Sequence, residues 1–323
     1  MARPPDIARL FAPRFGSEEF GAFSDELWQY QLQENPVIRR YCTLLGDDRM
    51  QFLPIRFFKD FEMRCGADWN PETVFQSSGT TGQERSRHLV RDLRLYESVL
   101  MHGFRHFYGE EGWTVFALLP NYLDQGHSSL VYMVRAWILD FGLPGSGFYL
   151  QNFDALRQGL AAATAARERI LLIGVSFALL DFAATHSVRL PADAIVMETG
   201  GMKGRREELT RAELHGRLRA AFGVDRIHSE YGMTELMSQA FSIGEERFRC
   251  PPWMRVVITD PYRPMKQLDH GRPGRLNLID LANVHSCAFI STDDMGIRYE
   301  DGSFEMLGRL EHAESRGCNL MYL

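Results

Sequence analysis

The sequence predicts an α/β protein with a mostly parallel, helix-covered sheet, followed by a β-rich C-terminal subdomain. From Trp113 to Ser229, short apolar runs alternate with helix-length segments through short connections. This alternation is typical of a parallel sheet with helices on its faces. Past Phe248 the helical period disappears, and short strand-like runs separated by turn residues follow. We therefore expect two parts, residues 1–247 and residues 248–323.

Each element of the first part is predicted from its local pattern. Apolar side chains recur on one helical face between Glu18 and Leu45, with a break at Asn35-Pro36. Asp92 is placed to cap a helix that runs through Phe104. The expected strands of the sheet are 113–119, 147–150, 171–175, 193–199 and 226–229, and the helices between them are 128–139, 155–169, 177–185 and 210–222.

Composition narrows the class of protein. The chain has 323 residues, of which 45% are hydrophobic and 24% charged, as in globular proteins. A formal charge of −6 provides no electrostatic footprint for nucleic acid and argues against a surface that seeks anionic lipid. No apolar run has membrane-spanning length, and the N-terminus lacks the core of a signal peptide. Five cysteines without a C-x-x-C pair suggest neither a zinc site nor a disulfide framework, so we expect a cytoplasmic location.

A polar, glycine-rich loop lies between two strand-like runs, and its sequence is Ser77-Ser78-Gly79-Thr80-Thr81-Gly82. Its glycines allow close backbone approach, and its N–H groups and hydroxyls can form a nest for phosphate oxygens. It is not the Lys-containing phosphate loop of nucleoside triphosphatases, because no lysine follows at the required place. A polar hairpin turn is the simpler alternative.

Two further loops follow expected strands, at the edge where parallel sheets bind ligands. One is Thr199-Gly200-Gly201-Met202-Lys203, and the other, residues 230–235, combines an aromatic ring, a glycine, a hydroxyl and a carboxylate. A nucleotide needs such a stacking surface, close backbone approach, a phosphate donor and a ligand for Mg²⁺. Asp293 and Asp294 could take the ribose hydroxyls, although an ordinary turn pair would have the same sequence.

In their order along the chain, these motifs resemble the core motifs of the adenylate-forming enzymes: acyl-CoA synthetases, peptide-synthetase adenylation domains and luciferases. Within that superfamily the chain looks most like the LuxE-type acyl-protein synthetases, the synthetase component of fatty-acid reductase systems. The resemblance implies the N-terminal domain of an adenylate-forming enzyme, without the mobile C-terminal domain, because the chain ends at Leu323. The finer resemblance rests on residues 52–59, 118–123, 128–133 and Arg316-Gly317-Cys318.

The resemblance also implies a role for each matched position. Thr234 would contact the α-phosphate of ATP, Glu235 would bind Mg²⁺, and Asp294 would bind the ribose hydroxyls. Arg309 would support the ribose or a phosphate, and either Arg85 or Arg87 would replace the lysine that usually follows the glycine-rich loop. The other ATP-binding positions would be Ser77, Ser78, Gly79, Thr80, Thr81 and Gly82 for the β- and γ-phosphates, Tyr231 on the adenine near Gly200 and Gly201, and Gly232.

Cys318 differs from the other cysteines because it lies in a short polar tail beside Arg316, and a nearby cation lowers a thiol pKa. The remaining cysteines, Cys42, Cys65, Cys250 and Cys287, are expected to be inert small hydrophobes. An acyl pocket is expected at Ser129, Val175, Phe177 and Met202, between the helices and loops that carry these residues.

These observations predict an acid–thiol ligase that uses ATP and Mg²⁺ to convert a carboxylic acid, expected to be fatty, to acyl-AMP. Cys318 would then take the acyl group as a thioester for a partner such as an acyl-CoA or fatty-acid reductase, with Thr234 and Arg309 assisting catalysis. Two alternatives stay open: a ligase whose acceptor is coenzyme A or a carrier protein, and a non-catalytic nucleotide or acyl-adenylate binding module. The acyl group, the acceptor, the oligomeric state and the pathway are not predicted.

Overall fold

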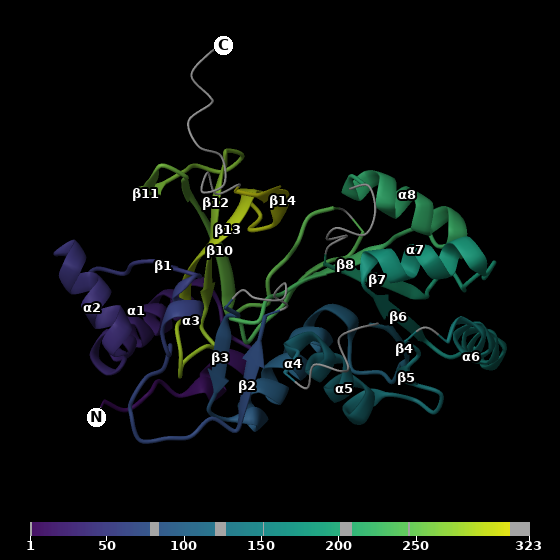
Figure 1. Ribbon diagram of the computed structural model, residues 1–323, viewed down its shortest axis with the longest axis horizontal. Coiled ribbons are helices and arrows are strands. Elements are labelled where there is room, and N and C mark those ends of the chain that lie inside the picture. The colour runs from purple at the N-terminus through teal and green to yellow at the C-terminus, as the bar shows by residue number, and fades with distance from the viewer. Residues whose placement is uncertain are drawn as a thin grey trace, which may run out of the picture.

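The computed structural model describes residues 2–77, 84–119, 127–150, 152–200, 209–244 and 246–310, and Figure 1 shows the arrangement of its elements. Its first large sheet has the strand order β5-β4-β6-β7-β8-β9, and all neighbours are parallel except β8 and β9. The strands are β4 (Thr114–Leu118), β5 (Gly147–Phe148), β6 (Ile170–Gly174), β7 (Ile195–Thr199), β8 (His228–Tyr231) and β9 (Ala240–Ser242).

Helices cover both faces of this sheet. In Figure 1, α7 and α8 lie side by side on one face, and α4 and α5 lie on the other. Every residue of β4, β6 and β7 is buried, as expected of parallel strands covered on both sides. The helices are α4 (Leu93–Tyr108), α5 (Ser129–Phe141), α6 (Phe153–Ala166), α7 (Ser176–Thr185) and α8 (Arg211–Phe222).

A second sheet gathers the C-terminal strands in the order β1-β13-β12-β10-β11, with β14 also paired to β13. Its neighbours are antiparallel except β1 and β13. The strands are β1 (Leu53–Pro54), β10 (Met254–Asp260), β11 (Arg263–Gln267), β12 (Pro273–Asp280), β13 (Phe289–Arg298) and β14 (Phe304–Arg309). The C-terminal sheet therefore includes a strand from the N-terminal part of the chain, and the division at residue 247 stays a prediction.

The N-terminal helices are hydrogen-bonded to the turn between β12 and β13. The buried Gln31 side chain donates to the carbonyls of Asn283, at 2.8 Å, and Val284, at 3.1 Å, and accepts from the Ala288 N–H at 3.0 Å. The elements of this region are a short 3₁₀ helix (Ile7–Phe11), α1 (Ser17–Glu34), α2 (Pro36–Leu45), α3 (Phe57–Asp60) and the hairpin of β2 (Thr73–Gln76) with β3 (Arg87–Val90).

The predicted α/β class is confirmed, and so are most elements. Asn35 ends α1, and its side chain accepts from the first N–H groups of α2, as its position before a proline indicated. The helix expected to reach Arg169 ends at Ala166, because Arg167 adopts the left-handed conformation with φ 57°. The strands β9 and β11, which are both short, were not predicted.

The described cysteines lie in the core or pack against it. Cys42, Cys65 and Cys287 are buried and Cys250 is partly buried, as expected. Burial raises the pKa of each of these thiols, that of Cys287 to about 12, which disfavours the reactive thiolate.

Within the described ranges, none of the helices combines the length and the apolar composition needed to cross a bilayer.

Candidate functional site

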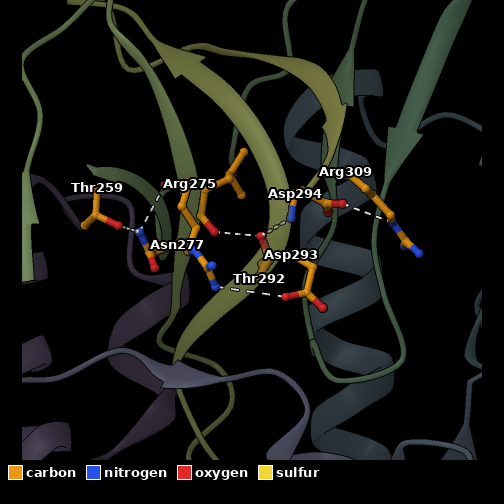
Figure 2. Close-up of polar contacts among 8 residues, drawn as sticks. Thr259, Arg275, Asn277, Thr292, Asp293, Asp294 and Arg309 are labelled. Atoms are coloured by element: carbon orange, nitrogen blue, oxygen red, sulfur yellow. Dashed lines mark hydrogen bonds and ion pairs between the residues drawn. The ribbon is translucent and has the colours of Figure 1, made fainter. Parts of the chain in front are cut away.

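The structure brings three predicted site residues into direct contact where the two sheets meet. Tyr231, the last residue of β8, donates its hydroxyl to Oδ2 of Asp294 at 2.9 Å. Arg309, the last residue of β14, donates from Nε to Oδ1 of the same carboxylate at 3.2 Å. Asp294 and Arg309 are register partners on β13 and β14, and Figure 2 shows them pointing toward each other.

Asp294 and Asp293 face opposite sides of β13, because side chains alternate along a strand. Asp294 is only 5% exposed, and its N–H donates to the Thr292 hydroxyl at 3.1 Å. Oδ1 of Asp293 instead lies 4.0 Å from a guanidinium nitrogen of Arg275 (Figure 2). The alternative that these two acids form a turn is wrong, since both lie inside a ten-residue strand.

The ring of Tyr231 is held by two other aromatic rings. Its centroid lies 5.7 Å from that of Phe248 and 5.6 Å from that of Phe304. Burial, together with the neighbouring Asp294 charge, raises the pKa of Tyr231 well above its usual value. The hydroxyl therefore stays protonated and acts as a fixed donor to Asp294.

The backbone around Tyr231 requires small residues. A side chain at Gly232 would collide with Oε1 of Glu230. Gly200, at the end of β7, has φ +51°, a conformation that glycine adopts without strain. Gly200 was predicted to lie near the adenine and Gly232 to belong to the ATP site; the chain turns at Gly200 and approaches Glu230 closely at Gly232.

Glu235 is buried, at 4% exposure, and is not an ordinary surface carboxylate. Burial raises the pKa of Glu235, while the Ser86 hydroxyl and the positive charges of Lys59 and Arg309 favour its charged form. Ser86 also forms the base of the glycine-rich loop, because its N–H donates to the Ser77 hydroxyl at 3.0 Å. One serine thus connects the start of the loop with the predicted metal ligand.

Lys59, His88 and Asn283 contribute to this region without having been predicted as site residues. Lys59 lies in α3, next to Phe58, whose ring contacts the His88 imidazole at 5.8 Å. From the sequence, only Arg85 and Arg87 were candidates for the cation that replaces the lysine usual after the glycine-rich loop. Arg85 is partly buried and Arg87 exposed, and which of them serves stays a prediction.

Two buried acids lie at the ends of β7 and β8 and were also missed. Glu198 accepts from the Ser176 hydroxyl at 3.0 Å and lies 3.7 Å from the His215 imidazole. Burial alone would raise the pKa of Glu198, but His215 and Ser229 lower it overall. Glu230 accepts from Thr199 at 2.5 Å, and burial, with the nearby Glu198 charge, raises its pKa to about 7.

The expected acyl pocket is described only in part. Val175 is buried, while Ser129 and Phe177 are partly buried at the starts of α5 and α7. Ser176 contacts both the Glu198 carboxylate and, at 3.5 Å, the Gly200 carbonyl. The predicted site residues that lie outside the described residues are Ser78, Gly79, Thr80, Thr81, Gly82, Gly201, Met202 and Cys318.

Among the described residues, no three His, Cys, Asp or Glu side chains come together as a ready-made metal site. Glu235 therefore stays a predicted Mg²⁺ ligand, and the described residues add no preformed cluster of acids around it.

Solved structures with a similar fold are adenylate-forming ligases. A 2-hydroxyisobutyryl-CoA ligase with 2-HIB-AMP and CoA superposes with a TM-score of 0.68 at 14% identity, over 96% of this chain and 73% of that one. ATP-bound MatB from Rhodopseudomonas palustris superposes with a TM-score of 0.56 at 18% identity, over 73% of this chain and 47% of that one. The fold is therefore that of the adenylate-forming enzymes, as the motifs predicted.

The family follows from sequence relatives. The model of the family described as "Acyl-protein synthetase, LuxE" matches residues 147–322, more than half of the chain. The long-chain-fatty-acid–luciferin-component ligase of Aliivibrio fischeri is 24% identical over 328 residues, 91% of this chain and 85% of that one. The Vibrio harveyi enzyme of the same name is 29% identical over 138 residues, 40% of this chain and 36% of that one. The chain belongs to the LuxE acyl-protein synthetase family, and we assign it to the acid–thiol ligases.

The raised pKa of Glu230 predicts a specific dependence of stability on pH. The folded state favours the neutral acid, so this contribution to stability is complete below pH 4.5 and is lost as pH rises toward 7. We expect Glu230→Gln to gain stability relative to the parent over that interval, by about 3 kcal/mol in the free energy of unfolding from urea titrations. The control is Glu213→Gln, because hydrogen bonds from Thr210 lower the pKa of Glu213 and confine its change to lower pH. A difference between Glu230→Gln and the parent that stays constant from pH 4.5 to 7 would contradict the assignment.

Proposed function

We propose that this protein activates a carboxylic acid, most simply a long-chain fatty acid, with Mg·ATP to form acyl-AMP, and then transfers the acyl group to Cys318. The observation that supports it best is the contact of Tyr231, Asp294 and Arg309 beside the buried Glu235. The relatives support the substrate class, because both are named as long-chain-fatty-acid ligases.

The nucleoside would be held by Tyr231 and Asp294. An aromatic ring fixed by two neighbours offers a preformed face for adenine, as Tyr231 does. A carboxylate has about four lone-pair positions, so Asp294 can accept both ribose hydroxyls in addition to its present donors. Arg309 uses one N–H for Asp294 and exposes 69% of its side chain, which leaves further donors for a phosphate.

The residues present fit a magnesium ion. Mg²⁺ usually binds through one or two carboxylates together with substrate phosphates, and Glu235 supplies one carboxylate. Bound there, the ion would neutralise the charge that develops on the phosphates. Lys59 and Arg309 already place positive charge near Glu235, so the region suits a polyphosphate.

The proposed chemistry has two steps. In the first, an oxygen of the substrate carboxylate bonds to the α-phosphorus, the α–β phosphoanhydride bond breaks, and pyrophosphate leaves. Thr234 and Arg309 would stabilise the charge on the α-phosphate. In the second, the Cys318 thiolate bonds to the acyl carbon and AMP leaves, which stores the acyl group as a thioester.

Two alternatives to this reaction scheme stay open. The acceptor could be coenzyme A or a carrier protein, with Cys318 incidental, or the chain could bind an adenylate without catalysis. The name of the Aliivibrio fischeri relative supports transfer to a protein component, because it describes a luciferin-component ligase. An acyl-accepting reductase is therefore the partner that we propose.

The first test is pyrophosphate exchange. The purified chain with Mg·ATP should exchange labelled pyrophosphate into ATP when the right acid from a panel of carboxylic acids is present. Glu235→Ala should slow this exchange about 100-fold or more, because a metal ligand is worth several kcal/mol of charge stabilisation. Glu26→Gln, which alters an exposed carboxylate on α1, should exchange like the parent. Parental exchange in Glu235→Ala would move the metal site elsewhere.

The second test compares the adjacent acids of β13. Each charge-assisted bond to a ribose hydroxyl contributes roughly 1.5–3 kcal/mol, so Asp294→Ala should weaken Mg·ATP binding by about 10- to 100-fold or more. Asp293→Ala is the matched control, because its side chain faces Arg275 on the other side of the strand. Calorimetric titration measures both, and Asp294→Asn checks that the effect follows the lost charge rather than misfolding. Equal weakening by Asp293→Ala would show that the ribose lies on the other face.

The third test separates the two steps. Labelled acid with Mg·ATP should leave a label on the parent that neutral hydroxylamine removes, as a thioester requires. Cys318→Ser should lose that label and keep pyrophosphate exchange, because the residues proposed for the first step precede residue 310. Cys250→Ser, which alters a partly buried thiol, serves as the control. Label that persists in Cys318→Ser would place the nucleophile elsewhere, and exchange without label on the parent would favour a diffusible acceptor.

A further inference from the structure

A buried histidine and an asparagine hold the backbone of the segment that contains Thr234 and Glu235. His88 on β3 is 1% exposed, and its Nδ1 lies 2.8 Å from the Thr234 carbonyl oxygen. Its Nε2 faces Oδ1 of Asn283 at 3.2 Å, and Nδ2 of Asn283 donates to the Glu235 carbonyl at 2.8 Å. We refer to these two side chains as the His88–Asn283 clamp.

The protonation state of His88 determines which of these contacts is a hydrogen bond. Burial lowers the pKa of His88 to about 4, so the ring is neutral near pH 7 and carries one N–H. The shorter contact assigns that proton to Nδ1, which donates to Thr234. The bond to the Glu235 carbonyl then belongs to Asn283, and Nε2, which carries no proton in this tautomer, forms no hydrogen bond with Oδ1 of Asn283.

The clamp fixes two consecutive peptide planes. A peptide unit is planar, so holding the carbonyls of Thr234 and Glu235 also sets the direction of the two bonds that flank the Glu235 Cα. Two N–H groups further along the segment are held as well, because those of Met237 and Ser238 donate to the buried Asp280 carboxylate at 2.8 and 3.0 Å. The segment is therefore bonded through its main chain to β3 and to the end of β12 and the turn that follows it.

The residue just before the strand that carries His88 also influences the Glu235 carboxylate. Ser86, two residues earlier, favours the charged form of Glu235 and bonds to Ser77 at the start of the glycine-rich loop. Phe58 covers the His88 ring from α3, and Gln31 supports Asn283 through its carbonyl. The clamp thus connects the loop, the N-terminal helices and the C-terminal sheet at Glu235.

We propose that His88 and Asn283 are positioning residues for adenylation: they hold the carbonyls of Thr234 and Glu235 so that the Thr234 hydroxyl and the Glu235 carboxylate meet the phosphates of Mg·ATP. This role rests on the proposed function, whereas the hydrogen bonds do not. Small displacements of a catalytic group slow the chemical step more than they weaken binding, since the reacting geometry tolerates less error than the bound one.

The test uses two substitutions at one position. Asn has its amide nitrogen near the place of Nδ1, so His88→Asn should keep the bond to Thr234, whereas the longer His88→Gln should lose it. We expect His88→Gln to lower the kcat of pyrophosphate exchange about 10- to 100-fold with little change in the KM for ATP, and His88→Asn to stay within about threefold of the parent. Hydrogen–deuterium exchange of residues 232–239 should increase only in His88→Gln.

The matched control is His285→Asn. His285 lines the same small cavity as His88, and burial likewise lowers its pKa to about 4. Its Nδ1 has no hydrogen-bond partner among the described residues, so this substitution should change neither measurement. The His285→Asn variant shows whether loss of any histidine from this cavity is enough to slow the reaction.

Each result of these experiments either supports or overturns the proposed role of the His88–Asn283 clamp. Equal activity of His88→Asn and His88→Gln, or slow turnover without increased hydrogen exchange at 232–239, would overturn the clamp. If the parent exchanges no pyrophosphate with any acid, the proposed function fails, and hydrogen exchange alone still tests the hydrogen bonds. If His88→Gln does not fold, Asn283→Asp replaces it, because it keeps the side-chain shape and removes the donor to Glu235; unchanged kcat and hydrogen exchange in that variant would equally overturn the proposal.

Discussion

The buried carboxylate of Asp280 is the constraint on which the junction of the two sheets depends. It is 0% exposed and accepts from the N–H groups of Met237 and Ser238 and, at 2.7 Å, from the Ser238 hydroxyl. A buried carboxyl without donors costs several kcal/mol, so the folded chain must bring the segment after β8 to the end of β12. Burial raises the pKa of Asp280 and these bonds oppose the rise, which shows that the donors offset part of that cost. The place where the sheets meet is consequently the place where Tyr231 and Glu235 lie.

Because the candidate site lies at this junction, it is assembled from residues of both sheets. Tyr231 comes from the parallel sheet and Asp294 from the antiparallel one, and their contact exists only when both sheets have formed. The buried acids Glu235 and Asp294 are balanced by Arg309, and for Glu235 also by Lys59. If Mg²⁺ and a polyphosphate bind here as proposed, each ion would compensate the charges that the other leaves, since buried acids and exposed cations lie close together.

Local patterns predicted most elements, but they did not indicate the residues that support the motif segments. Asp92 could be predicted as a helix cap and Asn35-Pro36 as a break, because both signals depend on neighbours in the sequence. His88 and Asn283 are 195 positions apart, and no local pattern indicates that they touch. An ordinary turn was the alternative for Asp293 and Asp294, yet both lie in β13, which pairs with β12 and β14, because tertiary pairing overrides weak strand propensity.

The relation between Arg309 and Cys318 follows from chain geometry. Cys318 is nine residues beyond Arg309, and a chain of that length spans at most about 30 Å. Any path of the intervening residues therefore keeps the Cys318 Cα within that distance of the Cα of Arg309, whose side chain is bonded to Asp294. The residues proposed for adenylation are held by the two sheets and by Asp280, whereas the proposed transfer needs only a thiol within reach of the acyl carbon. The two steps thus depend on different physical requirements: one on the rigidity of buried hydrogen bonds, the other on the length of the chain after β14.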